Sequence, residues 1–148
     1  MVWFWRLRTA RNIAMVHSKR GDLACALTWF KKALEIREKV LGKDHADTAT
    51  SYNNIAWVYD SQGEYKRALE WYMRALEIRK KALGEEHPFT AKTYNNIGMI
   101  YFQQGDTEKA LYWIQKALSI HEKTLGKEHP DSIILSNNID AVRSRCKA

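Results

Sequence analysis

Histidine is the side chain best suited to chemistry near neutral pH, and three of the five histidines recur at one spacing. His45, His87 and His129 are each 42 residues apart. Equal spacing raises the question of a shared metal ion. Neighbouring helices pack about 8–10 Å apart, so equivalent residues two helices on are about 16–20 Å apart and cannot share one ion. We therefore predict that these histidines cap loops and bind no metal.

The remaining reactive residue types form no recognisable site. Cys25 and Cys146 lie far apart and belong to no CxxC pair, which argues against zinc or a disulfide framework. No GxxxxGK[ST], GxGxxG or HExxH motif occurs. A catalytic site needs a nucleophile, a base and an orienting group held together. Every Ser, His, Asp and Glu that resembles part of such a motif recurs with the internal repeat of the chain and is explained by it. We expect no catalytic residues, no cofactor and no enzymatic activity.

Composition is that of a soluble folded protein, with 45% hydrophobic and 28% charged residues. The formal net charge of +7 is compatible with an acidic protein partner, an acidic peptide or nucleic acid. The apolar start MVWFWRLR is too short for a secretory signal or a membrane span, and no Asn-x-Ser/Thr acceptor occurs. We expect a cytoplasmic protein that does not contact the membrane.

An internal repeat of 42 residues organises the whole chain. Gly21, Gly63 and Gly105 keep this period, and the segment Tyr52-Asn53-Asn54-Ile55 recurs at 94–97. Within one unit, apolar residues at helical spacing predict a helix over 48–61 and a longer one over 65–83. Glycine separates the two helices, because it adopts the left-handed conformation that ends a helix. Asp22 and Asp106 stand where an N-cap belongs.

Small residues mark the faces where the paired helices meet. Ala14, Ala56 and Gly98 share one position of the period, and Ala26, Ala68 and Ala110 share another. Small side chains allow two helices to cross closely. Such a helix pair cannot bury its own faces, so we predict that it stacks on identical neighbours.

These positions resemble the tetratricopeptide repeat (TPR) signature, carried by Tyr52, Ile55-Ala56, Tyr59, Ala68, Tyr72 and Ala75. The 42-residue length, with ALEIREKVLGKDH and YNNIAWVY, is similar to the repeats of kinesin light chains and related microbial proteins. The resemblance implies an all-α fold, a right-handed α-α superhelical solenoid of helix pairs. We predict one domain over 1–148, with repeats at 6–47, 48–89 and 90–131 and a polar C-terminal capping helix at 132–146.

The N-terminal residues Trp3, Phe4 and Trp5 are apolar with no preceding helix to cover them. Three explanations stay open. These residues fold back on the first repeat, the chain is part of a longer array, or two chains meet there as a homo-oligomer.

A second stripe on each first helix lies beside the buried one. In TPR proteins these positions line the concave face and receive extended peptides. Trp57, Met99 and Phe102 are apolar side chains that the packing pattern does not require there; the alternative is that they pack between successive first helices. The asparagines suit a peptide backbone because an amide both donates and accepts, although they could also bridge neighbouring helices. The predicted peptide-binding residues are Arg8, Arg11, Asn12, Met15, Lys19, Asn53, Asn54, Trp57, Lys92, Asn95, Asn96, Met99, Phe102 and Asn137.

The stripe is net basic, which favours an acidic partner. Arg11, Asn54 and Lys92 match a two-carboxylate clamp of some TPR domains, but Met15 and Asn96 depart from it. The resemblance to kinesin light chains implies instead a protein or peptide partner with an aromatic and acidic segment. We therefore predict a protein-interaction adaptor. The alternatives are a self-assembling structural segment and, less favoured, a nucleic-acid-binding solenoid, because Lys and Arg are interleaved with Glu70 and Glu77.

Overall fold

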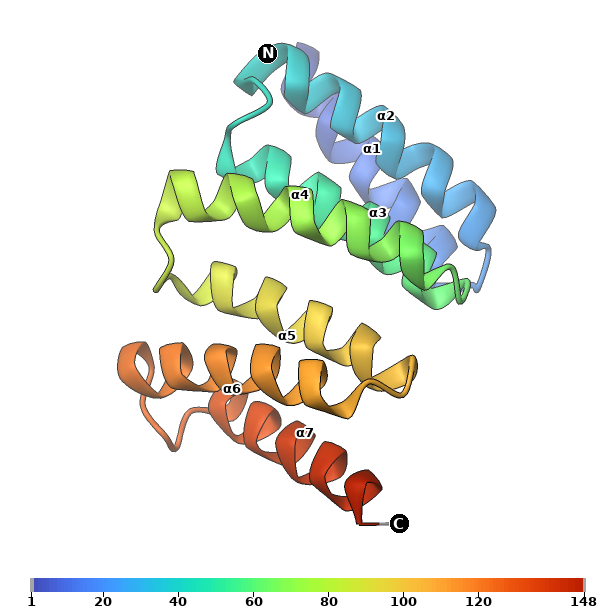
Figure 1. The fold of residues 1–148 in the computed structure, drawn as a ribbon. Coiled ribbons are helices and arrows are strands. Elements are labelled where there is room, and N and C mark those ends of the chain that lie inside the picture. The colour runs from blue at the N-terminus through green and yellow to red at the C-terminus, as the bar shows by residue number, and fades with distance from the viewer. Residues whose placement is uncertain (1, 148) are drawn as a thin grey trace. The chain divides into compact units, whose positions relative to one another are not determined.

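The computed structural model describes residues 2–147, and within them the chain forms seven α-helices and no strand (Figure 1). The two helices predicted from the second repeat are confirmed to within two residues at each end, which is the usual uncertainty of a helix boundary. The helices are α1 Val2–Lys19, α2 Leu23–Leu41, α3 Ala46–Ser61, α4 Tyr65–Leu83, α5 Pro88–Gln103, α6 Thr107–Thr124 and α7 Pro130–Cys146.

The recurrent histidines are N-caps, which confirms the prediction that they cap loops. Nδ1 of His45, His87 and His129 accepts a hydrogen bond from the backbone N–H two residues on, at 3.1, 3.1 and 3.2 Å. Each histidine so satisfies one of the free amides that begin a helix. Asp22 and Asp106 cap α2 and α6, as predicted, and each accepts a hydrogen bond from the backbone N–H three residues on.

Glycine allows the sharp turn between the two helices of a repeat. Gly63 has φ +75°, a left-handed conformation that costs a residue with a Cβ about 1–2 kcal/mol. Beyond it, the Glu64 N–H donates to the Tyr59 carbonyl at 2.9 Å. The bond closes the end of α3 and sets the direction in which α4 begins.

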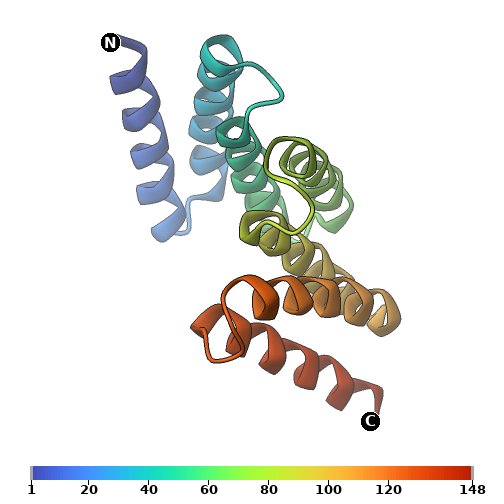
Figure 2. The same cartoon turned by 90° about the vertical axis from the view of Figure 1, so that its left-hand side faces the viewer.

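The helices form two compact units, one ending at Ile78 and the other beginning at Arg79, so the division falls within α4. In the first unit, α1 and α2 lie side by side and antiparallel (Figure 2), with Ala14, Ala26 and Phe30 buried. In the second unit, α6 packs against both α5 and α7. A Cβ on Gly98 of α5 would stand 2.6 Å from Cγ1 of Ile114 on α6, which confirms the predicted close approach.

One basic residue per repeat is buried at the same position of the period. Nη1 of Arg37 donates to Ser51 Oγ at 2.7 Å, and Nη1 of Arg79 donates to Thr93 Oγ1 at 2.7 Å. These bonds tie a second helix to the first helix of the following repeat. His121 occupies the position in the third repeat, with Nε2 3.3 Å from the Pro88 carbonyl.

The N-terminal aromatic residues form the first turn of α1, which begins at Val2. Trp3, Phe4 and Trp5 stay 48, 67 and 60% exposed, so the fold-back alternative is not what the structure shows. Cys25 and Cys146 are exposed free thiols. Across residues 2–147, no helix combines the length and the apolar character that a bilayer crossing requires.

Candidate functional site

Unit one carries two hollows lined by α1, α2 and α3, and we call the two together the α1–α3 channel. Its α1 side is the stripe Phe4, Arg8, Arg11, Met15 and Ser18, at the i, i+4, i+7, i+11, i+14 spacing of one helix face. Its α3 side carries Asp47, Asn53, Asn54 and Trp57. Two hollows open along this channel, one rich in arginine and one largely apolar.

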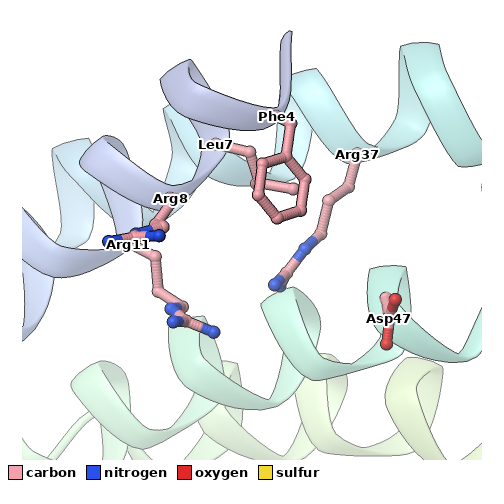
Figure 3. A pocket seen from close by; sticks show the side chains of 6 residues that line it. All are labelled: Phe4, Leu7, Arg8, Arg11, Arg37 and Asp47. Carbon is pink, nitrogen blue, oxygen red and sulfur yellow. The ribbon is translucent and has the colours of Figure 1, made fainter. Parts of the chain in front are cut away.

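The first hollow, the arginine pocket, has a volume of about 240 Å³ (Figure 3). Arg8 and Arg11 come from α1, Arg37 reaches in from α2, and Asp47 stands at the start of α3. Phe4 and Leu7 form its apolar wall. Three arginines and one aspartate line the pocket, so its lining is net positively charged.

Arg37 is the least ordinary of these side chains, because it is 7% exposed and yet charged. Its Nη1 has Ser51 as a partner, but its buried Nε has no hydrogen-bond partner. Burial lowers the pKa of Arg37; the Asp47 carboxylate opposes that shift, and the Arg11 guanidinium adds to it. An anion that enters this pocket would meet the guanidinium groups of Arg8 and Arg11 as well as that of Arg37.

The second hollow, the Trp57 hollow, has a volume of about 430 Å³. Met15 and Trp57 are exposed, at 45 and 43% of their surfaces, and Phe30 forms the buried floor. A tryptophan and a methionine beside an open hollow suit an apolar side chain. Its full lining is Met15, Ser18, Lys19, Phe30, Asn53, Asn54 and Trp57.

In unit two the matching stripe of α5 is bridged by side chains of α7. Lys92 Nζ lies 3.8 Å from Asp131 Oδ2, and Asn95 Oδ1 accepts a hydrogen bond from Asn138 Nδ2 at 3.2 Å. The Arg145 guanidinium lies 4.3 Å from the centroid of the Phe102 ring. Arg145 also donates to the Phe102 carbonyl at 2.8 Å. These contacts occupy the groups that a peptide would use.

The structure therefore divides the predicted stripe. Arg8 and Arg11 meet in the arginine pocket, whereas Met15, Lys19, Asn53, Asn54 and Trp57 meet at the Trp57 hollow. Asn12 and Asn137 are exposed and line neither hollow, and Asn96 and Met99 are half-buried on α5.

Sequence reasoning missed several lining residues of the two hollows, above all Arg37. A signal for Arg37 existed, because positions 37, 79 and 121 carry Arg, Arg and His at one period. The other residues missed are Phe4, Leu7, Phe30 and Asp47.

Several lysines and arginines elsewhere are paired with carboxylates. Lys39 meets Glu35 at 2.9 Å, Arg67 meets Glu64 at 3.0 Å and Lys123 meets Glu86 at 2.7 Å. Exposed pairs of this kind are typical of solvated helix faces. This pairing fits the interleaving seen in the sequence.

Comparison with known proteins places this geometry in a family. The tetratricopeptide repeat profile matches residues 5–81, 62–123 and 89–139. No curated protein sequence matches the chain. The crystal structure of BtubC (BKLC) from P. vanneervenii is similar over 95% of this chain and 56% of its own, with a TM-score of 0.85 and 25% identity. The chain thus spans little more than half the length of that protein.

Two further structures share the fold. A putative kinesin light chain from Podosopora anserina, with nearly identical TPR-like repeats, has a TM-score of 0.83 at 22% identity, over 96% of this chain and 67% of its own. The type III secretion translocator chaperone SycD from Yersinia enterocolitica has a TM-score of 0.71 at 14% identity, over 91 and 88% of the two chains. The seven helices in residues 2–147 and the glycine turns between them have the arrangement expected of this repeat, and the profile matches extend along the chain. The chain belongs to the tetratricopeptide repeat family.

Proposed function

We propose that this chain is a protein-interaction module and that it binds an extended acidic peptide segment in the α1–α3 channel. The repeats themselves support an interaction role. The acidic specificity follows from one observation. Arg8, Arg11 and the buried Arg37 converge on a pocket whose single carboxylate is Asp47. No described residue is assigned a catalytic role.

An acidic side chain of the peptide would enter the arginine pocket. Guanidinium groups hold carboxylates through paired N–H donors, and such charge-assisted bonds are about twice as strong as neutral ones. Arg8 and Arg11, which are both exposed, supply such donors at the pocket. A lysine would be repelled there, so the pocket would select for the sign of the charge.

An apolar side chain of the same peptide would fill the Trp57 hollow. The α1 residues that line the two hollows, 4–11 and 15–19, are centred about nine residues apart, or about 14 Å at the helical rise. An extended peptide advances about 3.3 Å per residue, so about four residues separate the two anchors. Side chains four apart in an extended strand point to the same side, as this geometry needs.

A panel of fluorescent peptides tests this register. Each peptide carries one tryptophan and one aspartate, and the spacing between them runs from two to six. We expect the tightest binding at a spacing of about four, and loss of binding when lysine replaces aspartate. Equal affinity at every spacing, or no effect of the lysine peptide, would contradict the proposal.

Variants of the chain provide the second arm. Removing an aromatic anchor costs about 2 kcal/mol or more, so Trp57→Ala should weaken binding about 30-fold. Arg11→Ala should weaken only peptides that carry the aspartate. Arg6→Ala is the matched control, because Arg6 is exposed on the same helix and lines neither hollow. Binding that is unchanged in the double variant Trp57→Ala, Arg11→Ala would exclude the channel.

Self-assembly through the N-terminal turn is a second candidate, which the exposed Trp3 and Trp5 favour. Arg6 and Arg8 lie 5.8 and 5.3 Å from the centroids of the Trp3 and Trp5 rings, so the patch mixes aromatic and basic groups. Sedimentation of the wild type and of the double variant Trp3→Ser, Trp5→Ser measures whether the chain self-associates through this turn. A concentration-dependent dimer that the variant loses supports assembly, whereas monomers in both cases exclude it.

A further inference from the structure

The turn between α1 and α2 brings together three different metal-binding side chains. Nδ1 of His17 lies 3.4 Å from Oδ2 of Asp22, and Oδ1 of Asp22 accepts the backbone N–H of Cys25 at 3.1 Å. One ligand atom from each of the three residues lies within 4.8 Å of the other two. Cys25 is exposed, and the His17 and Asp22 side chains keep 29 and 46% of their surfaces open.

The backbone of this turn has the same hydrogen bond in all three repeats. The Asp22 N–H donates to the His17 carbonyl at 2.9 Å, and two later turns repeat that bond at 2.9 Å, from Glu64 to Tyr59 and from Asp106 to Tyr101. The repeat therefore holds three side chains close together in each turn, whatever their chemistry.

The other two turns fill these positions with a tyrosine, an acid and a base. In the second repeat the Arg67 guanidinium lies 5.7 Å from the centroid of the Tyr59 ring and pairs with Glu64 at 3.0 Å. In the third repeat Lys109 stands over Tyr101 at 5.3 Å and pairs with Asp106 at 3.3 Å. Both turns are closed by a cation that satisfies the ring and the carboxylate.

The first repeat keeps the acid and changes both of its partners. His17 stands where the other repeats have tyrosine, and Cys25 stands where they have arginine or lysine. The first turn therefore lacks the cationic side chain that closes the other two. Both positions hold a metal ligand in the first repeat, and one ligand atom of each lies within 4.8 Å of the other. A bound cation would stand where the guanidinium or ammonium stands in the other turns.

We propose that the α1–α2 turn binds a zinc ion through Nδ1 of His17, a carboxylate oxygen of Asp22 and the thiolate of Cys25. Zinc accepts nitrogen, oxygen and sulfur ligands at about 2.0–2.3 Å in tetrahedral geometry, which sets the ligand atoms about 3.3–3.8 Å apart. His17 and Asp22 already have this separation. Rotation of the exposed Cys25 side chain brings in the third ligand, and water takes the fourth position.

Binding exchanges one proton for the metal. The Asp22 carboxylate holds a hydrogen bond from the thiol, which raises the pKa of Cys25 above its ordinary value. Zinc displaces that proton to solvent, and neither the sulfur nor the metal changes oxidation state. The ion would then join the end of α1 to the start of α2. No two cysteines lie near each other in the sequence, which is why the sequence alone indicated no metal site.

The test uses the full chain, reduced and stripped with a chelator, and titrated with Co²⁺ as a spectroscopic probe and with Zn²⁺ by calorimetry. We expect one ion per chain and a thiolate-to-cobalt charge-transfer band that Zn²⁺ removes. Absence of the band, or half an ion per chain, overturns the proposal.

Matched variants come from the chain itself. His17→Tyr and Cys25→Arg install the residues of the second repeat, so the turn has a side-chain set that this fold already uses. Each should weaken binding more than about 100-fold, beyond the 10–100-fold that loss of an outer-shell partner costs. Cys146→Ser should bind as the wild type does. Undiminished binding in Cys25→Arg, or loss in Cys146→Ser, contradicts the assignment.

A thermal melt guards against a misfolded variant. Zinc should raise the Tm of the wild type, because it binds only the folded turn, and should leave the Tm of a helical Cys25→Arg variant unchanged. An equal rise of Tm in both proteins would place the metal elsewhere.

Discussion

Gly98 is the position where helix packing makes the sharpest demand on one side chain. A Cβ there would stand 2.6 Å from Cγ1 of Ile114, 3.1 Å from the Ala110 carbonyl oxygen and 3.2 Å from Cβ of Trp113. Gly98→Ala gains about 1 kcal/mol of helix stability from backbone entropy and propensity. Overpacking a close helix contact costs about 1–3 kcal/mol. The approach to Ile114 Cγ1 is shorter than real Cβ atoms tolerate and forces that side chain to shift, so we expect net destabilisation of about 1 kcal/mol.

The other repeats identify the atom responsible. Ala14 and Ala56 occupy the position of Gly98, and their counterparts to Ile114 are Phe30 and Tyr72. An alanine is therefore tolerated where the partner is aromatic, and the Cγ1 atom of the β-branched Ile114 is what excludes it. In an Ile114→Ala background the 2.6 Å clash is gone, and Gly98→Ala should become stabilising by up to about 1 kcal/mol.

A double-mutant cycle measures this coupling. Urea unfolding of the four proteins, followed by circular dichroism, should give a coupling of about 1–2 kcal/mol between positions 98 and 114. Ile114→Ala will itself cost about 2–5 kcal/mol, so the cycle is read from differences within each background. If Gly98→Ala stabilises the wild type by the full propensity gain, or if the coupling is zero, the packing argument is wrong.

Three further predictions concern single residues. Gly63→Ala should lose about 1–2 kcal/mol from backbone strain alone, because φ is +75° and no atom lies within 4 Å of the new Cβ; urea unfolding measures it. Glu85→Gln should lower the Tm at neutral pH. Hydrogen bonds from Lys116 and Tyr94 lower the pKa of Glu85 from 4.5 to about 2. The stability that the Glu85 carboxylate contributes is therefore present above pH 4.5 and is lost as the pH falls toward about 2. The Tm values of the wild type and the variant should converge there. Burial lowers the pKa of His121 below 6.5, so the unfolded chain takes up the proton first and stability falls as the pH drops below 6.5. His121→Gln should flatten the Tm profile in that range; an unchanged slope would contradict the assignment.

Helix positions and caps were predictable because they depend on near neighbours. The predicted helix 48–61 is observed as Ala46–Ser61, and the two extra residues at its start follow from the cap at His45. Repetition strengthened the inference, since one cap observed three times cannot be accidental. The division of the chain within α4 had no signal in a sequence whose period runs through it.

The candidate site was predictable in outline only. Helical periodicity fixes which residues share a face, and so it brought Arg8, Arg11 and Trp57 to the α1–α3 channel. It did not reveal that Arg145 covers Phe102, a contact between residues 43 apart in the chain. Nor could it show that Arg37 is buried with an unpaired Nε, because burial depends on how neighbouring helices pack.

The amino-acid sequence by itself determined the repeat, the helix pairs, their glycine turns and their histidine and aspartate caps. These features arise from hydrogen bonds between residues a few positions apart and from the spacing of apolar side chains. Tertiary structure decided which part of the facing stripe stays open, how far the arginines of the pocket are buried, and that His17, Asp22 and Cys25 stand within reach of one ion. Those outcomes depend on distances between side chains of different helices, and periodicity carries no information about such distances.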